Sequence, residues 1–207
     1  FIQTNIIGTH KILSDLLEYK QQKNFRFVHV STDEVYGTLS YKESAFTVDT
    51  PYKPNSPYAA SKAASDLLVR SFVKTYKLPA IITNCSNNFG PRQFPEKLIP
   101  KTILLAERNQ KIPIYGTGTN IRDWVFVLDH CDAILHVLFK GRKGESYNIA
   151  GKNEFDNLTI VKKILNIMGR SENLIQFTKD RPGHDLRYSL EAKKIYRELN
   201  WKPSYNF

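Results

Sequence analysis

The chain has 207 residues, of which 41% are hydrophobic, 12% aromatic and 24% charged, which is enough for one large domain, or a domain and a half, with a buried core. This composition excludes a disordered chain, and no apolar run reaches the roughly 18 residues that a membrane-spanning helix needs. The net charge is +10, but the Lys and Arg residues are scattered rather than gathered into an arm, which disfavours nucleic acid as a partner.

The cysteines and the chain start give two further expectations. Cys85 and Cys131 lie far apart without a neighbouring ligand pattern, so neither a disulfide scaffold nor a zinc site is expected, and a reducing cytoplasm fits best. The first residue is Phe1 and the one methionine is Met168, so we expect the chain to be an internal piece of a longer protein.

Helical and strand patterns alternate along the chain. In chain order they predict a helix over 4–23, a buried strand over 25–31, a helix over 57–76, a buried strand over 80–86, and helices over 96–109 and 157–168. Pro57 suits the first turn of its helix, and Gly169 suits the position that ends the last one. Such alternation is typical of an α/β fold with a parallel sheet.

Polar residues follow both predicted strands. Thr32, Asp33 and Glu34 open a long connection that runs to residue 56, and Asn87 and Asn88 follow the second strand. Because ligands of open parallel sheets bind outside the carboxyl ends of the strands, we expect these residues to face a site. Long connections of this kind are usually functional.

Tyr58 and Lys62 are four residues apart on a predicted helix, so their side chains share one face. An ammonium beside a phenol stabilises the phenolate, as a tyrosine needs if it is to remove a hydroxyl proton near neutral pH. The same spacing recurs at Tyr19 and Lys23, which we interpret as an exposed surface pair. The strand-end carboxylates favour the catalytic interpretation for Tyr58 and Lys62.

Asp33 and Glu34 are adjacent carboxylates with two interpretations. They can simply form a turn or carry the negative charge at a helix N-terminus. Alternatively, different environments can push their pKa values apart, leaving one as an acid and the other as a base. A hydroxyl such as that of Thr32 could then orient a substrate oxygen beside Tyr58.

Five segments in order carry a resemblance to a known family. They are STDEVYG (31–37), PYAASK (57–62), NNFGPRQFPEKLIP (87–100), IRDW (121–124) and DRPGHD (180–185). With them the chain resembles the extended short-chain dehydrogenase/reductase enzymes that act on nucleotide sugars, and within these the dTDP-glucose 4,6-dehydratases. The segments span nearly the whole chain.

The resemblance implies a Rossmann-like, doubly wound parallel sheet with a smaller C-terminal substrate-binding domain. Residues 1–86, about 121–152 and 186–200 would form part of the NAD-binding domain, and 87–120, 153–185 and 201–207 the nucleotide-sugar domain. In the family a Gly-rich turn that binds NAD lies upstream of these residues. Here Gly116 and Gly118 are followed by Ile121 where a third glycine is required, so we interpret them as an ordinary turn.

The resemblance also implies a reaction. Hydride leaves C4 of the glucose of dTDP-glucose for NAD, water is eliminated across C5–C6, and hydride returns to C6. Carried over by position, Tyr58 would be the base of the oxidation, Lys62 would hold the nicotinamide ribose and lower the Tyr58 pKa, and Thr32 would contact the sugar hydroxyl. Glu34 would remove the C5 proton, and Asp33 would protonate the departing 6-hydroxyl.

Further positions would bind cofactor or substrate by the same resemblance. Thr4 and Asn88 would lie on the cofactor side, with Tyr58 and Lys62. Substrate would be bound by Asn87, Lys97, Leu98, Pro113, Ile114, Tyr115, Arg122, Asn157, Asp180, Arg181, Pro182, Gly183 and His184. Simpler interpretations remain: Leu98 and Tyr115 as core, His184 as a loop histidine, and Arg122 with Asp123 as a surface pair.

Three functional hypotheses follow. The first is the dehydratase, the second a related epimerase or decarboxylase, and the third a remnant that binds sugar nucleotides without catalysis. Asp33 beside Glu34 favours the first, because epimerisation at C4 needs no such acid and base pair. The resemblance further implies a homodimer in which helices 4–23 and 57–76 pair with their copies. We expect a cytoplasmic enzyme with no membrane or nucleic-acid partner and no metal.

Overall fold

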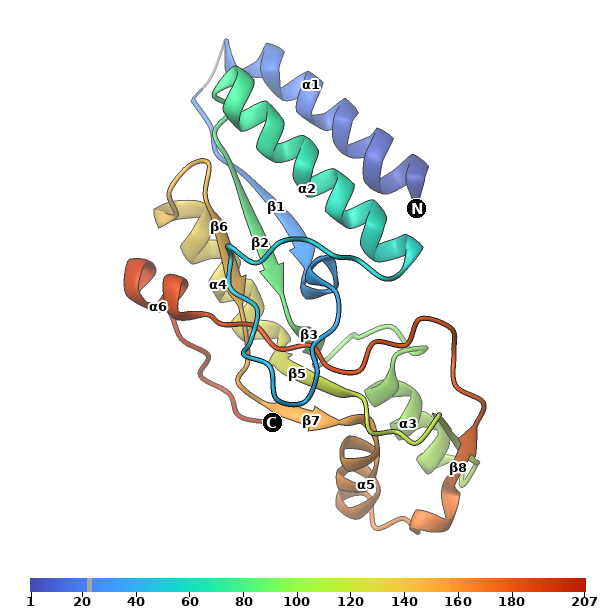
Figure 1. Cartoon of the computed structure of the whole chain (residues 1–207). Helices are drawn as coiled ribbons and strands as arrows, with labels where there is room; N and C mark the ends of the chain where they lie inside the picture. Colours follow the sequence, from blue (N-terminus) through green and yellow to red (C-terminus); the bar gives the residue numbers. More distant parts are fainter. Residues whose placement is uncertain (22–23) are drawn as a thin grey trace.

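Two groups of strands and helices make up the computed structural model, which describes residues 1–21 and 24–207 (Figure 1). The first group contains η1 (Ile2–Gly8), α1 (Thr9–Lys20), β1 (Phe27–Thr32), η2 (Asp33–Tyr36), α2 (Pro57–Tyr76), β2 (Ala80–Cys85), α4 (Val127–Lys140), β6 (Ser146–Ile149) and α6 (Lys193–Leu199). The second contains β3 (Asn87–Phe89), α3 (Leu98–Glu107), β4 (Ile112–Tyr115), β5 (Ile121–Phe126), β7 (Glu154–Asp156), α5 (Asn157–Ile167), η3 (Glu172–Leu174) and β8 (Ile175–Thr178).

The first group is built on a parallel sheet with strand order β1-β2-β6. Side chains of β2 alternate between its two faces. Ala80 and Ile82 pack with residues of α1 and α2, whereas Ile81 packs with Ala133 and Val137 of α4. Helices therefore cover both faces of the sheet, as a doubly wound fold requires (Figure 1).

The second group contains two small sheets, β3-β5-β7 and β4-β8. β5 pairs in parallel with β3 and antiparallel with β7. Helices α3 and α5 pack against these strands around Ile112, Ile114, Val161 and Leu165, all of them buried. Segment 121–126 forms β5, whose strand partners are β3 and β7, and the domain boundaries that the resemblance implies stay a prediction.

The predicted elements agree well with those of the structure. Helix α2 begins and ends at the predicted residues, and it is capped by Ser56, whose Oγ accepts from the Ala59 N–H at 3.1 Å. The first helix differs: residues 2–8 are π-helical and the α-helix begins at Thr9. Its predicted end at Lys23, and with it the Tyr19–Lys23 pair, lies outside the described residues.

The turn after β4 contains two glycines. Gly116 and Gly118 both have positive φ in the turn after β4, which confirms the interpretation of this Gly-x-Gly as a turn.

No helix in the described part of the chain has the length and apolar character needed to cross a membrane. Within residues 1–21 and 24–207, no group of three or more His, Cys, Asp or Glu side chains could hold a metal ion, and Cys85 and Cys131 are free thiols.

Candidate active site

The carboxyl ends of β1 and β2 lie side by side. The two strands are parallel, and their last residues, Thr32 and Cys85, are directly aligned. The chain then turns into η2, which starts at Asp33. Thr32 caps this turn, because its Oγ1 accepts from the Glu34 N–H at 3.3 Å, and the same hydroxyl donates to Asp33 Oδ1 at 3.2 Å. The local cap thus fixes both carboxylates at the strand end, as the sequence predicts.

The two carboxyl groups have different environments. Asp33 is 2% exposed, and its Oδ2 has no hydrogen-bond partner among the described residues. Burial, followed by the charge of Glu34, raises the pKa of Asp33 to about 8, so Asp33 is mostly protonated at pH 7. Burial also raises the pKa of the less buried Glu34, but Arg122 opposes the rise. Asp33 is therefore a proton donor at neutral pH.

Cations from the second group of elements oppose the rise of the Glu34 pKa that burial causes. Arg122, Arg181 and Lys97 each lower its pKa. These are three of the residues expected to bind the nucleotide, and they come from β5, from the loop before residue 185 and from the start of α3. The structure therefore brings Glu34 and this part of the predicted substrate site together, although they are far apart in sequence.

Tyr58 and Lys62 lie on the first turns of α2. Burial, and then the charge of Glu34, raises the pKa of Tyr58 to about 12. Burial and the nearby carboxylates therefore dominate the pKa of Tyr58 in this structure, and the expectation that Lys62 lowers this pKa stays a prediction. The Lys62 ammonium donates to the Val30 carbonyl oxygen at 2.8 Å, and burial lowers the pKa of Lys62.

Arg122 is buried and held in place. It is 5% exposed, its Nη2 donates to the Asp185 carbonyl at 2.9 Å, and its guanidinium lies 4.3 Å from the centre of the Tyr188 ring. Asp123 is buried too, and it accepts from Ser86 Oγ at 2.7 Å. The interpretation of Arg122 and Asp123 as a surface ion pair is therefore wrong.

Asn88 is oriented by a residue that sequence reasoning missed. Its Oδ1 lies 2.8 Å from Nδ1 of His130, and because an amide oxygen only accepts, Nδ1 carries the hydrogen. The Asn88 amide nitrogen donates to the Ser86 carbonyl at 3.2 Å. Burial lowers the pKa of His130 to about 4, which keeps the ring neutral. No local pattern marks His130, since it lies on α4, more than forty residues away.

The remaining predicted residues lie in different surroundings. Tyr115 is 44% exposed, whereas the side chain of Ile114 is buried in the core and can reach a ligand only through its backbone. Nδ1 of His184 lies 2.7 Å from Asp180 Oδ1, so the loop histidine has a partner. Partly or fully exposed positions are Thr4, Asn87, Lys97, Leu98, Pro113, Asn157, Arg181, Pro182 and Gly183.

Comparison with known proteins shows the family to which the chain belongs. A sequence profile described as GDP-mannose 4,6 dehydratase matches residues 1–207, so the chain belongs to this family. Proteins named dTDP-glucose 4,6-dehydratase from Xanthomonas campestris pv. campestris (strain B100) and Neisseria gonorrhoeae are 50% and 51% identical to it. The comparisons cover the whole chain but 63% and 65% of these relatives, so the chain spans less than two thirds of their length.

Solved structures of other proteins are similar to this chain over its whole length. The dTDP-glucose 4,6-dehydratase from Bacillus anthracis in complex with NAD has a TM-score of 0.95 at 47% identity, over 100% of this chain and 65% of that one. The enzyme of the same name from Streptomyces venezuelae with NAD and TYD bound has a TM-score of 0.96 at 44% identity, covering 100% and 63%. A UDP-glucuronic acid 4-epimerase from Bacillus cereus is less similar, with a TM-score of 0.92, 28% identity and coverage of 100% and 64%.

The raised pKa of Asp33 makes a prediction about stability. The folded pKa of about 8 exceeds the ordinary 3.8, so the unfolded chain loses this proton first, and wild type loses stability as the pH rises from about 4 to about 8. Asp33→Asn removes the titration, so its free energy of unfolding should rise relative to wild type across this range and level off above it. Denaturant unfolding at a series of pH values measures the difference.

Glu43→Gln is the matched control with the opposite sign. Hydrogen bonds from Ser40 hold the pKa of Glu43 below its ordinary 4.5, so this variant should lose stability relative to wild type as the pH rises through that region. A difference between Asp33→Asn and wild type that does not change with pH would contradict the buried, protonated Asp33.

Proposed function

We propose that the protein is an NAD-dependent dTDP-glucose 4,6-dehydratase, which oxidises C4, eliminates water across C5–C6 and returns the hydride to C6. The product is dTDP-4-keto-6-deoxyglucose. The observation that carries the proposal is the pair of adjacent carboxyl groups at the end of β1, of which Asp33, with a pKa of about 8, holds a proton at neutral pH. Elimination needs a general acid and a general base at once, and this pair can supply both.

Each carboxyl group has its own part in the elimination. Glu34 removes the C5 proton, which the new 4-keto group makes acidic, and the cations Arg122, Arg181 and Lys97 favour its ionised form. Asp33 gives its proton to the departing 6-hydroxyl. The buried Oδ2 of Asp33 has no partner among the residues that the structure describes, which suits an atom that meets the substrate.

Tyr58, as the phenolate that a neighbouring Lys62 ammonium favours, accepts the proton of the C4 hydroxyl, and Thr32 orients that hydroxyl. After burial, the charge of Glu34 is the largest cause of the high Tyr58 pKa. The cations that offset the charge of Glu34 therefore also favour the Tyr58 phenolate. The two steps are thus coupled through charge.

The residues present suit the ribose and nicotinamide end of NAD. An ammonium has three donors, and the one acceptor that Lys62 contacts within the described residues is the Val30 carbonyl, so two N–H groups remain for ribose hydroxyls. Lys62 and Asn88 lie at the carboxyl end of the sheet, where parallel sheets bind nucleotides. Thr4 and Tyr58 complete this side. When bound, NAD accepts and returns the hydride.

The nucleotide end of the substrate would lie against the second group of elements. A guanidinium matches the oxygens of a diphosphate, and Arg122 and Arg181 both act on the region of Glu34. The exposed ring of Tyr115 is suited to stack on a base. We therefore propose that one domain binds the cofactor and carries the catalytic groups, and that a smaller domain binds the nucleotide sugar. We also propose that the enzyme is cytoplasmic.

We also propose that the protein is a homodimer through η1, α1 and α2. These helices expose the apolar side chains of Ile12, Tyr19, Leu67 and Tyr76. Light scattering at micromolar concentration should give the mass of a dimer, and Leu67→Glu should shift it toward the monomer. Leu135→Glu, at an exposed apolar position on α4, is the control and should stay dimeric. A monomeric wild type would refute the dimer.

The elimination chemistry can be tested directly. The whole protein, incubated with NAD and dTDP-glucose in deuterated water, should give a 4-keto-6-deoxy product with deuterium at C5. Glu34→Gln should still form NADH in the first turnover, because C4 oxidation does not use Glu34, but should exchange the C5 proton at least about 100-fold more slowly. Mass spectrometry and absorbance report the two steps.

Two results would count against this account. Equal loss of both steps in Glu34→Gln would remove the role assigned to Glu34. Absence of the product from wild type that binds NAD would favour an epimerase or decarboxylase, for which UDP-sugars are the next substrates to try, or a protein that binds without catalysis.

A further inference from the structure

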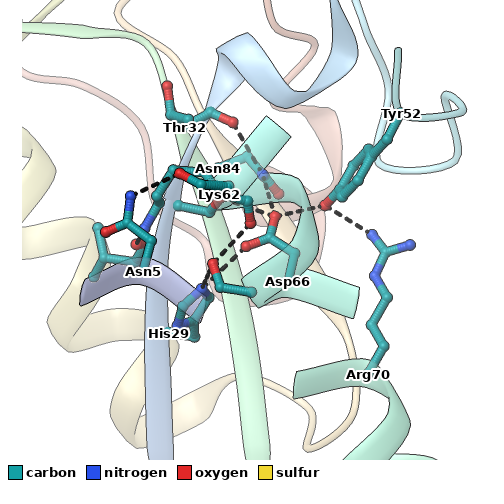
Figure 2. A network of polar contacts seen from close by, with 12 residues as sticks. Asn5, His29, Thr32, Tyr52, Lys62, Asp66, Arg70 and Asn84 are labelled. Carbon is teal, nitrogen blue, oxygen red and sulfur yellow. Dashed lines mark hydrogen bonds and ion pairs between the residues drawn. The ribbon is translucent and has the colours of Figure 1, made fainter. Parts of the chain in front are cut away.

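A buried polar network joins α2 to the sheet beside the candidate site (Figure 2). At its centre is Asp66, which is 0% exposed. Figure 2 shows its carboxylate between side chains from three other parts of the chain. The donors are Ser31 Oγ at 2.8 Å, Tyr52 Oη at 2.8 Å, His29 Nε2 at 3.0 Å and Asn84 Nδ2 at 3.4 Å.

The chemistry of these partners suits a charged carboxylate. An ionised carboxylate only accepts hydrogen bonds, and all four partners can donate one. The hydrogen of the His29 ring toward Asp66 therefore lies on Nε2. A buried charge is costly unless it is hydrogen-bonded. If one member of such a network is removed, the remaining buried polar groups lose hydrogen-bond partners. The network thus favours one arrangement of α2, β1, β2 and the loop that contains Tyr52.

Lys62 is fixed to the same stretch of β1 as Asp66. The two residues are one helical turn apart on α2, so their side chains are neighbours. The Lys62 ammonium donates to Val30 O, and the residues on either side of Val30, His29 and Ser31, donate to Asp66. One turn of α2 is therefore held at two points to three consecutive residues of β1.

The network also reaches Thr32 and the long connection after β1. The Asn84 amide that approaches Asp66 also donates to the Thr32 carbonyl at 3.2 Å. Tyr52 lies in the connection between η2 and α2, and its hydroxyl accepts from Arg70 Nη2 at 3.1 Å while it donates to Asp66. Asp66 thus links the end of β1, the loop and the helix that carries Tyr58 and Lys62.

We propose that Asp66 is a positioning residue for Lys62: it clamps the turn of α2 that carries Lys62 onto β1 and places a buried negative charge one helical turn from Lys62. Because Asp66 is 0% exposed, we assign it a role through Lys62 and not through contact with a ligand. The part of this inference that concerns catalysis rests on the proposed function, whereas the placement and charge of Lys62 do not.

The electrostatics agree with the geometry. Burial lowers the pKa of Lys62, and the nearby charge of Asp66 opposes this, so Asp66 helps to keep the ammonium protonated. Cys85 of β2 also acts on Lys62, but burial raises its own pKa to about 12, so the thiol is neutral at physiological pH. His29 faces Asp66 from β1. The charges of Glu34 and Asp33 raise the pKa of Tyr58 on the same helix. Segment η1, which packs on α2, has no charged residue.

The first test measures Lys62 itself. Lysines of the whole protein are labelled by reductive ¹³C-methylation, and the Lys62 signal is identified by its absence from Lys62→Arg. In Asp66→Asn, which keeps the shape of the side chain, the pKa of Lys62 should fall by about one unit. Asp129→Asn is the control: Asp129 is a buried carboxylate of α4 that accepts from the Ser204 and Tyr205 N–H groups, and its loss should leave the Lys62 signal unchanged.

The second test is the first-order rate constant of NADH formation in a single turnover, which does not depend on how much of the protein is folded. It should fall about 10-fold in Asp66→Asn and about 3-fold in Tyr52→Phe, which removes one donor and keeps the charge, with KM for the sugar nucleotide within about 2-fold of wild type. Asp129→Asn should lower stability without changing the rate constant.

The outcomes separate the two claims. An unchanged Lys62 pKa in Asp66→Asn, or an unchanged rate constant in either variant, would overturn the positioning role and leave Asp66 as a stabilising residue alone. If Asp66→Asn does not fold, the rate constant of Tyr52→Phe decides whether the positioning role stands. If wild type forms no NADH, the proposed function fails, and the Lys62 titration still decides the role of Asp66.

Discussion

The contact between α2 and the end of β1 is the interaction on which the candidate site depends. Tyr58 and Lys62 lie on the helix, and Thr32, Asp33 and Glu34 lie at and directly after the strand. A helix that slid along the strand by one turn would move about 5.4 Å and separate the two sets. The hydrogen bonds of Asp66 and Lys62 to His29, Val30 and Ser31 oppose this sliding.

The side chains of the candidate site act on one another's pKa values through their charges. Burial keeps Asp33 protonated at neutral pH, and burial also raises the pKa of Glu34, but cations from the second group of elements oppose this second rise. The charge of Glu34 in turn raises the pKa of Tyr58. A ligand that brings its own charges into this site will therefore change several protonation states at once, which suits a reaction with several proton transfers.

Patterns that are local in sequence predicted much of the fold and singled out candidate residues at the strand ends. Helix 57–76 could be placed because Pro57 marks its start, and Asp33 and Glu34 could be singled out because they follow a buried strand. Environment could not be predicted in the same way. The pKa of Tyr58, the burial of Arg122 and the partnership of His130 with Asn88 depend on packing between distant segments. The burial of Asp66 could not be predicted from the sequence either, because an aspartate in a helix is usually exposed.

The central claim is that Asp33 holds a proton at pH 7 while Glu34 serves as the base, and infrared spectroscopy of the whole protein tests it most directly. The difference spectrum between wild type and Asp33→Asn should contain the C=O stretch of a protonated carboxyl group at pH 7, and this band should disappear as the pH rises through about 8. A spectrum without this band at pH 7, or a band that titrates near the ordinary pKa of 3.8, would contradict the account.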